Sequence, residues 1–475
     1  MPRPFPVRGV IEGFYGAPWS HEARLHAIEF LARRGMNAYV YAPKGDPRHR
    51  SRWREPYDAA DAERFRALAE ACAARDTRFG FAVSPGLDID YQDAADRAVL
   101  LGKLVPLLDA GVAWFVLALD DIPLRPGLGP DQAALTTWLL TELANRVDGV
   151  RLSVVPTEYV GTRPSEYLSE LAKSLPDDVD VMWTGPTVCS PRITAAGARA
   201  WQDAIGGHAT ILWDNYPVND TIMAKELHLG AYRGRDADLS DVVEGVLCNP
   251  MVQPRASLVA LATAAAFLRD PNSYDETSAW EEAIAAVGGV YTSHLRALAF
   301  ACMDGPLRAP ESTELRRRVD ALGSGLPDEE LTEALAGVKG FLDALLLAGD
   351  ERFLGSGDPL ADEVAPWAVQ ARKEAEAGLA ALSLWRQVRR REGPDAERAL
   401  NQAFAVLFLW EAARAGDRVV CGPRFAVHPA VVQLPDGRPA LDVELAVRED
   451  ANAVDRLCRD ALAAYAAWCA EAGGA

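Results

Sequence analysis

Short apolar runs alternate with segments of helical period over the first part of the chain. The runs are rich in β-branched residues and almost continuously hydrophobic, which is typical of parallel strands buried on both faces. They cover Val7–Phe14, Met36–Pro43, Arg78–Ser84, Trp114–Leu119, Arg151–Val155, Val179–Trp183, Ala209–Trp213 and Gly245–Cys248. Eight strand–helix alternations over about 270 residues predict an α/β fold, a (β/α)8 TIM barrel.

Segments with one apolar face lie between most of these runs and predict helices. They cover His21–Arg34, Ala59–Ala74, Gln92–Leu108, Asp131–Arg146, Pro164–Ser174 and Thr194–Ile205, and an eighth helix is expected over Ala256–Arg269. A doubly wound open sheet is the alternative architecture. No Gly-rich phosphate-binding loop follows the first run, which disfavours that alternative.

The pattern changes after Asp270-Pro271-Asn272, where the chain becomes rich in Ala, Leu, Glu and Arg at helical period. This stretch continues to about Arg414 and predicts a helical bundle. A short β-hairpin is predicted near 424–447, with Pro435-Asp436-Gly437 as its turn, and a last helix over Asn452–Glu471. We therefore expect a barrel domain over residues 1–272 and a mostly helical C-terminal domain over 273–475. Breaks between helices are expected at Gly305-Pro306, Gly323–Pro327, Gly355–Pro359 and Gly393-Pro394.

Composition and charge narrow the class of ligand. Hydrophobic residues make up 49% of the 475 residues, so a large core is feasible, and the net charge is -19. A field of that sign repels phosphate groups, so neither nucleic acid nor a membrane is an expected partner, whereas a neutral sugar fits. The 7 cysteines are widely spaced without a CxxC, and no apolar leader opens the chain, so a cytoplasmic location is expected. The oligomeric state is not indicated.

Polar and turn-forming residues gather where the predicted strands end, which is where the chemistry of a TIM barrel lies. This concentration indicates a functional site more strongly than any one short motif does. Among these residues, Asp120 and Asp121 directly follow an apolar run and are the candidates for acid–base chemistry. Helix capping needs only one carboxylate, and Ile122-Pro123 begins a loop. The 7 histidines form no HxH or HExxH and none ends a strand, so neither a metal nor a cofactor is predicted.

The adjacency of Asp120 and Asp121 constrains any glycosidase mechanism. A retaining glycosidase that uses a protein nucleophile places its two carboxyl groups about 5–5.5 Å apart on opposite sides of the sugar. Neighbouring residues approach from one side, so the nucleophile should come from elsewhere. The carbonyl oxygen of a substrate 2-acetamido group can take that role. One Asp would then orient the acetamide N–H, and the other would protonate the leaving oxygen.

Other strand-end side chains are candidates for sugar recognition. Trp183 and Trp213 are equally compatible with a sugar-facing role and with core packing. Lys44 is a candidate for contact with a sugar hydroxyl, or an ordinary surface lysine. The turn-forming residues Asn215, Asp220 and Asn249 can also supply the fixed donors and acceptors that a sugar ring needs.

Eight blocks at these strand ends resemble, in order, the motifs of glycoside hydrolase family 84, the O-GlcNAcase family, also described as hyaluronidase-like. The resemblance implies a barrel that hydrolyses terminal β-linked N-acetylglucosamine (GlcNAc) with retention, through an oxazoline intermediate. The substrate would be a GlcNAc-containing glycoside or glycoprotein. The blocks are Gly9–Gly16, Tyr41–Lys44, Ser84–Asp88, Asp120–Ile122, Pro156–Tyr159, Trp183–Pro186, Trp213–Asn215 with Asn219-Asp220, and Asn249-Pro250.

The same resemblance implies a role for each matching residue. Asp120 would polarise the acetamido group, and Asp121 would act as general acid and then as base. Tyr159 and Asn215 would support the acetamido group and the intermediate, and its pocket would be lined by Thr184 and Trp213. The contacts to the sugar hydroxyls would come from Gly13, Lys44, Asp220 and Asn249.

Three other functions are compatible with parts of this pattern. A broader β-N-acetylhexosaminidase or an endo-acting relative would share the carboxylate pair. A non-catalytic GlcNAc-binding barrel would keep Trp213 and Asn249, but it should have lost one of the two Asp residues, and both are present. A metal-dependent barrel hydrolase is disfavoured by the missing histidine ligands.

Overall fold

The computed structural model describes residues 3–303, 314–322, 328–389, 396–422, 425–427, 431–433, 439–441, 447–449 and 452–472. The chain forms two compact units. The first comprises Met1–Thr221, Ala231–Trp280 and Pro429–Ala446, and the second Ile222–Gly230, Glu281–His428 and Val447–Ala475. The domain division proposed above at residue 272 stays a prediction.

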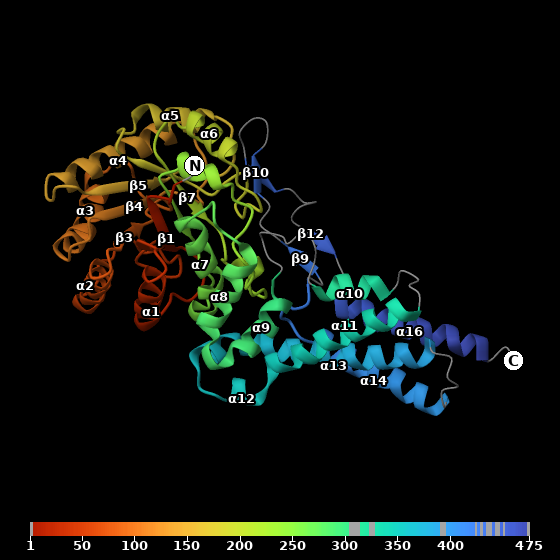
Figure 1. The fold of residues 1–475 in the computed structure, drawn as a ribbon. Helices are drawn as coiled ribbons and strands as arrows, with labels where there is room; N and C mark the ends of the chain where they lie inside the picture. Colours follow the sequence, from red (N-terminus) through yellow and green to blue (C-terminus); the bar gives the residue numbers. More distant parts are fainter. Residues whose placement is uncertain are drawn as a thin grey trace. The chain divides into compact units, whose positions relative to one another are not determined.

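Eight parallel strands form a closed barrel in sequence order, which confirms the predicted TIM barrel (Figure 1). The first strand closes the barrel by pairing with the last, with Val7 opposite Gly245. Each predicted run matches one strand, and several runs extend a residue or two into the turns that follow. The strands are β1 Val7–Glu12, β2 Ala38–Tyr41, β3 Arg78–Val83, β4 Trp114–Ala118, β5 Arg151–Val155, β6 Asp180–Trp183, β7 Thr210–Asp214 and β8 Gly245–Cys248.

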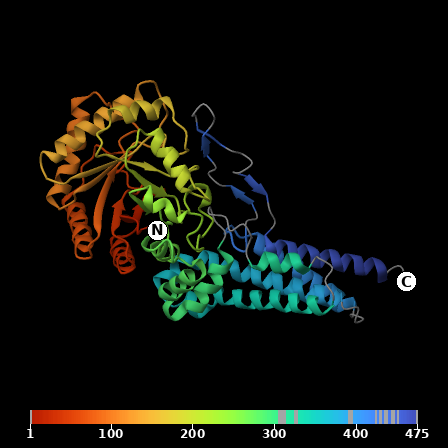
Figure 2. The ribbon, with the colours of Figure 1, turned by 45° about the horizontal axis from the view of Figure 1, so that its top comes forward.

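Helices cover the outside of the strands, as both ribbon views show (Figures 1 and 2). Side chains of Ser20, Asp58, Asp93, Ser165 and Thr194 accept hydrogen bonds from the first turns of α1, α2, α3, α5 and α6, which explains where these helices begin. The helices are α1 His21–Ala32, α2 Ala59–Ala73, α3 Ala94–Asp109, α4 Leu128–Ala144, α5 Glu166–Ser174, α6 Ala195–Ala204 and α7 Pro254–Arg269.

The connection between β7 and β8 differs from the expected strand–helix alternation. It contains two short 3-10 turns, η1 Thr221–Met223 and η2 Ala237–Asp241, in place of an α-helix. A buried ion pair between Asp214 and Arg235, at 2.5 Å, ties this connection to the end of β7. Such a pair helps to fix a connection in which few backbone groups are bonded within helical turns.

The barrel interior is filled by side chains from all around the sheet, so it is a core and not a channel. Trp213 belongs to this core, and Tyr159 packs against it. Chemistry is therefore confined to the strand ends and their loops. Other members of the core include Val7, Ile11, Val40, Trp114, Val116, Met182, Ile211 and Leu247.

The second unit is mostly helical, which confirms the predicted helical C-terminal region (Figure 2). Its long helix α13 packs against α11, α14 and α16. Buried alanines along α13, such as Ala368 and Ala371, allow this close approach. The helices of the C-terminal region are α8 Glu276–Gly288, which spans the boundary between the units, α9 Thr292–Ala301, α10 Glu314–Leu322, α11 Asp328–Leu346, α12 Glu351–Leu354, α13 Pro359–Arg389, α14 Ala396–Arg414 and α16 Ala453–Ala472, with short turns η3 Gly289–Tyr291 and η4 Leu347–Gly349.

Among the residues described between α14 and the last helix, four short strands are present. β10 Val431–Gln433 pairs antiparallel with β11 Pro439–Leu441, and β9 Phe425–Val427 with β12 Val447–Glu449. The predicted turn at residues 435–437 lies outside the described residues, as do the predicted breaks at 305–306, 323–327 and 393–394. The break expected at Gly355–Pro359 separates α12 from α13. In the described part of the chain, no helix is long and apolar enough to cross a membrane.

Candidate active site

The chain turns sharply between Asp120 and Asp121, directly after β4. Asp121 has a φ of +56°, in the left-handed region that Asp tolerates better than most residues. The two side chains consequently lie in different surroundings. Asp120 is 6% exposed, whereas Asp121 is exposed to solvent. Adjacency in the sequence therefore does not mean equivalence in the site.

Asp120 lies between two buried cations, Lys44 and Arg50, but only Lys44 is close enough to its carboxylate for a hydrogen bond. The Nζ atom of Lys44 lies 2.6 Å from its Oδ2 atom, and both side chains are almost fully buried. The other oxygen, Oδ1, is buried without any hydrogen-bond partner from the protein. An unsatisfied buried acceptor costs about 1–3 kcal/mol. Oδ1 is therefore placed to accept a hydrogen bond from a ligand N–H.

Asp121 accepts hydrogen bonds from two tyrosines. The hydroxyl of Tyr15 donates to Oδ2 at 2.7 Å, and that of Tyr159 donates to Oδ1 at 2.9 Å. Burial, followed by the charge of Asp121, raises the pKa of both phenols well above the ordinary value. Both hydroxyls therefore stay protonated, and they fix the orientation of the exposed carboxyl group.

Tyr15 also connects Asp121 to Asp220. Its backbone N–H donates to Oδ2 of Asp220 at 2.6 Å. Tyr15 was not among the residues predicted individually, although it stands in the block Gly9–Gly16. An exposed tyrosine in a loop is not part of any helix or strand pattern in the sequence, so its contact with Asp121 is visible only in the structure.

A second hydrogen-bonded group ties together the ends of β1, β7 and β8. The Oδ1 atom of Asn249 accepts from the backbone N–H of Gly13 at 3.1 Å, and its Nδ2 donates to Oδ1 of Asn215 at 2.9 Å. The indole N–H of Trp213 donates to the same oxygen at 3.0 Å. A Cβ atom on Gly13 would lie 2.2 Å from the Trp213 ring, so only glycine fits there.

The two tryptophans that the sequence left open have different surroundings. Trp183 is fully buried and stacks on Trp201, with 5.8 Å between ring centroids, which is core packing. Trp213 is part of the barrel core but also reaches Gly13 and Asn215. Thr184, next to Trp183, is buried and donates its backbone N–H to the carbonyl of Tyr159 at 3.0 Å.

The structure brings the ten predicted site residues into one connected set at the strand ends, although their roles stay predictions. The backbone N–H of Lys44 donates to the carbonyl of Phe14 at 3.2 Å and so links the carboxylate group to the Gly13 group. The ten are Gly13, Lys44, Asp120, Asp121, Tyr159, Thr184, Trp213, Asn215, Asp220 and Asn249. Among the described residues, no group of three or more His, Cys, Asp or Glu side chains is arranged to hold a metal ion.

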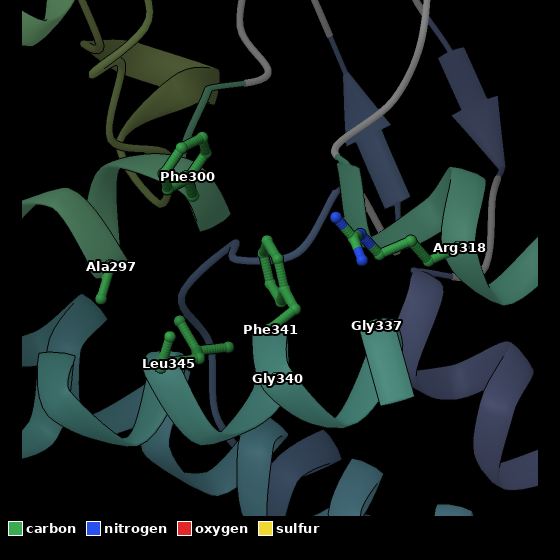
Figure 3. A pocket seen from close by; sticks show the side chains of 8 residues that line it. Ala297, Phe300, Arg318, Gly337, Gly340, Phe341 and Leu345 are labelled. Atoms are coloured by element: carbon green, nitrogen blue, oxygen red, sulfur yellow. The ribbon is translucent and has the colours of Figure 1, made fainter. Parts of the chain in front are cut away.

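A cavity of about 380 Å³ lies in the second unit, between α9, α10 and α11 (Figure 3). Its walls include the rings of Phe300 and Phe341 and the side chain of Leu345, with Arg318 beside them. An apolar cavity with a single cationic side chain provides no acid–base pair. The carboxylates at the barrel strand ends are therefore the better candidate for catalysis.

The protonation of Asp220 gives a testable property of this site. Burial, and then the charge of Asp121, raises the pKa of this carboxyl. A carboxyl group whose pKa rises on folding destabilises the folded state at every pH above the pKa that the group has in the unfolded chain. We expect Asp220→Asn to raise the melting temperature at pH 8 and this gain to shrink as the pH falls toward 4.5.

Thermal unfolding of both proteins across that pH range measures the effect. Asp109→Asn is the matched control, because Asp109 is exposed at the end of α3. A variant that loses stability at pH 8, or a difference that does not depend on pH, would contradict the prediction.

Comparisons with known proteins agree with the geometry of the site. A family model described as beta-N-acetylglucosaminidase (NAGidase) matches residues 8–301. The protein O-GlcNAcases of Rattus norvegicus and Mus musculus are each 33% identical over 276 residues, which cover 55% of this chain and 30% of theirs. The match thus spans less than a third of the length of these relatives.

A solved structure is similar over almost the whole chain. It is that of a mutant of the Thermobaculum terrenum O-GlcNAc hydrolase, with a TM-score of 0.84 and 28% identity, covering 99% of this chain and 97% of that one. The family model matches more than half of the chain, including both carboxylates and all the strand-end blocks. This chain therefore belongs to the beta-N-acetylglucosaminidase family, the glycoside hydrolase family 84 that its motifs resemble.

Proposed function

We propose that this chain is a retaining exo-β-N-acetylglucosaminidase, which removes terminal β-linked GlcNAc from a glycoside or glycoprotein. Family membership supports the class of reaction. The observation that carries the mechanism is the unequal pair at the end of β4. Asp120 is buried with one oxygen lacking a donor, whereas Asp121 is exposed and oriented by two phenols.

In the first step, the acetamido oxygen of the substrate acts as the nucleophile. Oδ1 of Asp120 accepts the acetamide N–H, and its charge stabilises the positive charge that develops on that group. The carbonyl oxygen attacks C1, the bond from C1 to the aglycone oxygen breaks, and the electron pair leaves with that oxygen. Asp121 supplies the proton, so an alcohol and a protonated oxazoline (an oxazolinium ion) result, with its N–H still bonded to Asp120.

In the second step, Asp121 acts as a base. It removes a proton from water, the water oxygen bonds to C1, and the C1–O bond of the oxazoline breaks. Two displacements at C1 return the β configuration, and the acetamide regains its original form. Lys44 offsets the negative charge of Asp120 throughout, at 2.6 Å. The reaction needs no cofactor.

Recognition of the sugar follows from the same set of residues. Asp220, Lys44 and Asn249 offer one charged acceptor, one charged donor and one amide for the hydroxyl groups. A carboxylate that holds the hydroxyls at C4 and C6 leaves no room for a further sugar there, which makes the enzyme exo-acting. The 7 cysteines are widely spaced in the sequence and form no CxxC, which supports a reducing compartment and hence a cytoplasmic location.

A panel of 4-nitrophenyl β-glycosides of GlcNAc, GalNAc and glucose tests this proposal. We expect turnover of the GlcNAc compound and at least about 10³-fold less of the glucose compound, because glucose lacks the internal nucleophile. Comparable turnover of the GalNAc compound would indicate a broader hexosaminidase. Binding of GlcNAc without turnover of any compound would indicate a non-catalytic barrel. A GlcNAc-modified peptide then tests whether glycoproteins are substrates.

A further inference from the structure

We propose that Arg50 is a positioning residue, which holds the turn between Asp120 and Asp121 and so gives the two carboxyl groups separate tasks. The inference rests on the proposed function, because it concerns the same pair. Nothing in the sequence distinguishes this arginine from its neighbours Arg48, Arg52 and Arg54 in the loop between β2 and α2.

The guanidinium of Arg50 contacts both backbone carbonyls of the pair. Its Nη2 atom donates to the carbonyl of Asp121 at 3.2 Å, and its two Nη atoms lie 3.4 and 3.5 Å from that of Asp120. Nη1 also donates to the hydroxyl of Ser84 at 2.8 Å. The same Nη1 lies 3.9 Å from Oδ1 of Asp120, too far for a hydrogen bond, and Arg50→Lys would keep this positive charge. Arg50 is 7% exposed, so solvent does not compete strongly for these contacts.

The loop that carries Arg50 is itself fixed to β3. The backbone N–H of Ser84 donates to the carbonyl of His49 at 2.9 Å, and Nδ1 of His49 lies 2.9 Å from the carbonyl of Ala82. Burial lowers the pKa of His49 to about 3, so this histidine is neutral and adds no competing charge. The guanidinium therefore has a defined place between the ends of β3 and β4.

The turn at Asp121 needs such support. A residue with positive φ is strained relative to the usual backbone regions, and it persists only where its surroundings hold it. Arg50 bonds the carbonyl oxygens of Asp120 and Asp121, which belong to the peptide groups before and after the strained residue. A planar guanidinium can serve several acceptors at once. A lysine ammonium at the same place has its three donors on a single nitrogen and cannot reach the same acceptors with the geometry of the planar fork.

The consequence of the turn is catalytic, although Arg50 does not touch the reacting atoms. The turn directs the carboxyl group of Asp121 to Tyr15 and Tyr159, while that of Asp120 stays on Lys44. Without Arg50, Asp121 can relax to negative φ, and its carboxyl group then leaves both phenols. The loss should fall mainly on proton donation to the leaving group.

Arg50→Lys, made in the whole 475-residue chain, tests the proposal with two substrates. We expect kcat/KM for methyl β-GlcNAc to fall by about 100-fold, and that for the activated 2,4-dinitrophenyl β-GlcNAc by less than about 5-fold. Arg52→Lys is the matched control, because Arg52 lies on the same loop with its side chain 58% exposed. The control should leave both values unchanged.

A second variant, Ser84→Ala, keeps the charge of Arg50 but removes the hydroxyl that anchors it. We expect a smaller loss with the same preference for the methyl glycoside, so the proposal stays testable if Arg50→Lys fails to fold. Equal losses on both substrates, or no loss in either variant, would overturn the positioning role. A wild-type protein inactive on both glycosides would instead refute the proposed function.

Discussion

Asp121→Asn is expected to lower kcat/KM for a β-GlcNAc alkyl glycoside or glycopeptide by about 10³-fold, and that for a dinitrophenyl glycoside by less than about 10-fold. An alkoxide leaves C1 only if it gains a proton as the bond breaks. A nitrophenolate leaves without one. Asn keeps the size of the side chain and can still accept from one of the two tyrosines. Steady-state kinetics on the two substrates measures the difference.

The matched control for this variant is again Asp109→Asn, which should leave both substrates unaffected. Asp109 is exposed and lies at the end of α3. Equal losses on the two substrates would remove the general-acid assignment of Asp121. The ratio between substrates therefore carries the information, and the size of either loss alone does not.

Asp120→Asn is expected to lower kcat/KM on both substrates by about 10²–10³-fold. Participation of the acetamide precedes the departure of any leaving group, so a better leaving group does not rescue this variant. Asn offers Nδ2 or Oδ1 to the acetamide but lacks the negative charge that stabilises its developing positive charge. A loss confined to the alkyl glycoside would mean that Asp120 acts on the leaving oxygen instead.

The same variant should also be less stable, because Lys44 would keep a buried ammonium without its anion. Removal of one partner of a buried ion pair costs roughly 3–5 kcal/mol when the other charge stays in place. Activities should therefore be normalised to the folded fraction, which chemical denaturation measures. The 2.6 Å contact between Lys44 and Asp120 implies that the ion pair contributes to the stability of the fold. A variant as stable as the wild-type protein would contradict that implication.

The barrel could be predicted from the sequence because its signals are local. Strands buried on both faces are apolar throughout, and each predicted run coincides with one strand. The connection between β7 and β8 could not be predicted in this way. It is held by the ion pair between Asp214, at the end of β7, and Arg235, within the connection. These two residues are distant in the sequence, so no local pattern indicates their contact.

The sequence predicted the site residues that end a strand or stand in a recognisable motif, but not those that depend on tertiary contacts. All ten predicted residues lie in one connected set, because parallel strands of a barrel end on the same face. Arg50 and Tyr15 were missed individually because their roles depend on tertiary contacts with Asp121. The turn at Asp121 was also hidden, since an Asp in a loop is compatible with either sign of φ.

The most direct test of the account concerns the acetamido nucleophile. The measurement is kcat/KM for 4-nitrophenyl β-GlcNAc analogues whose N-acetyl methyl group carries zero to three fluorine atoms. Fluorine withdraws electron density from the carbonyl oxygen, so a substrate-assisted enzyme should become slower with each fluorine added. A rate that does not change across the series would mean that the acetamide is not the nucleophile and would contradict the roles assigned to Asp120 and Asp121.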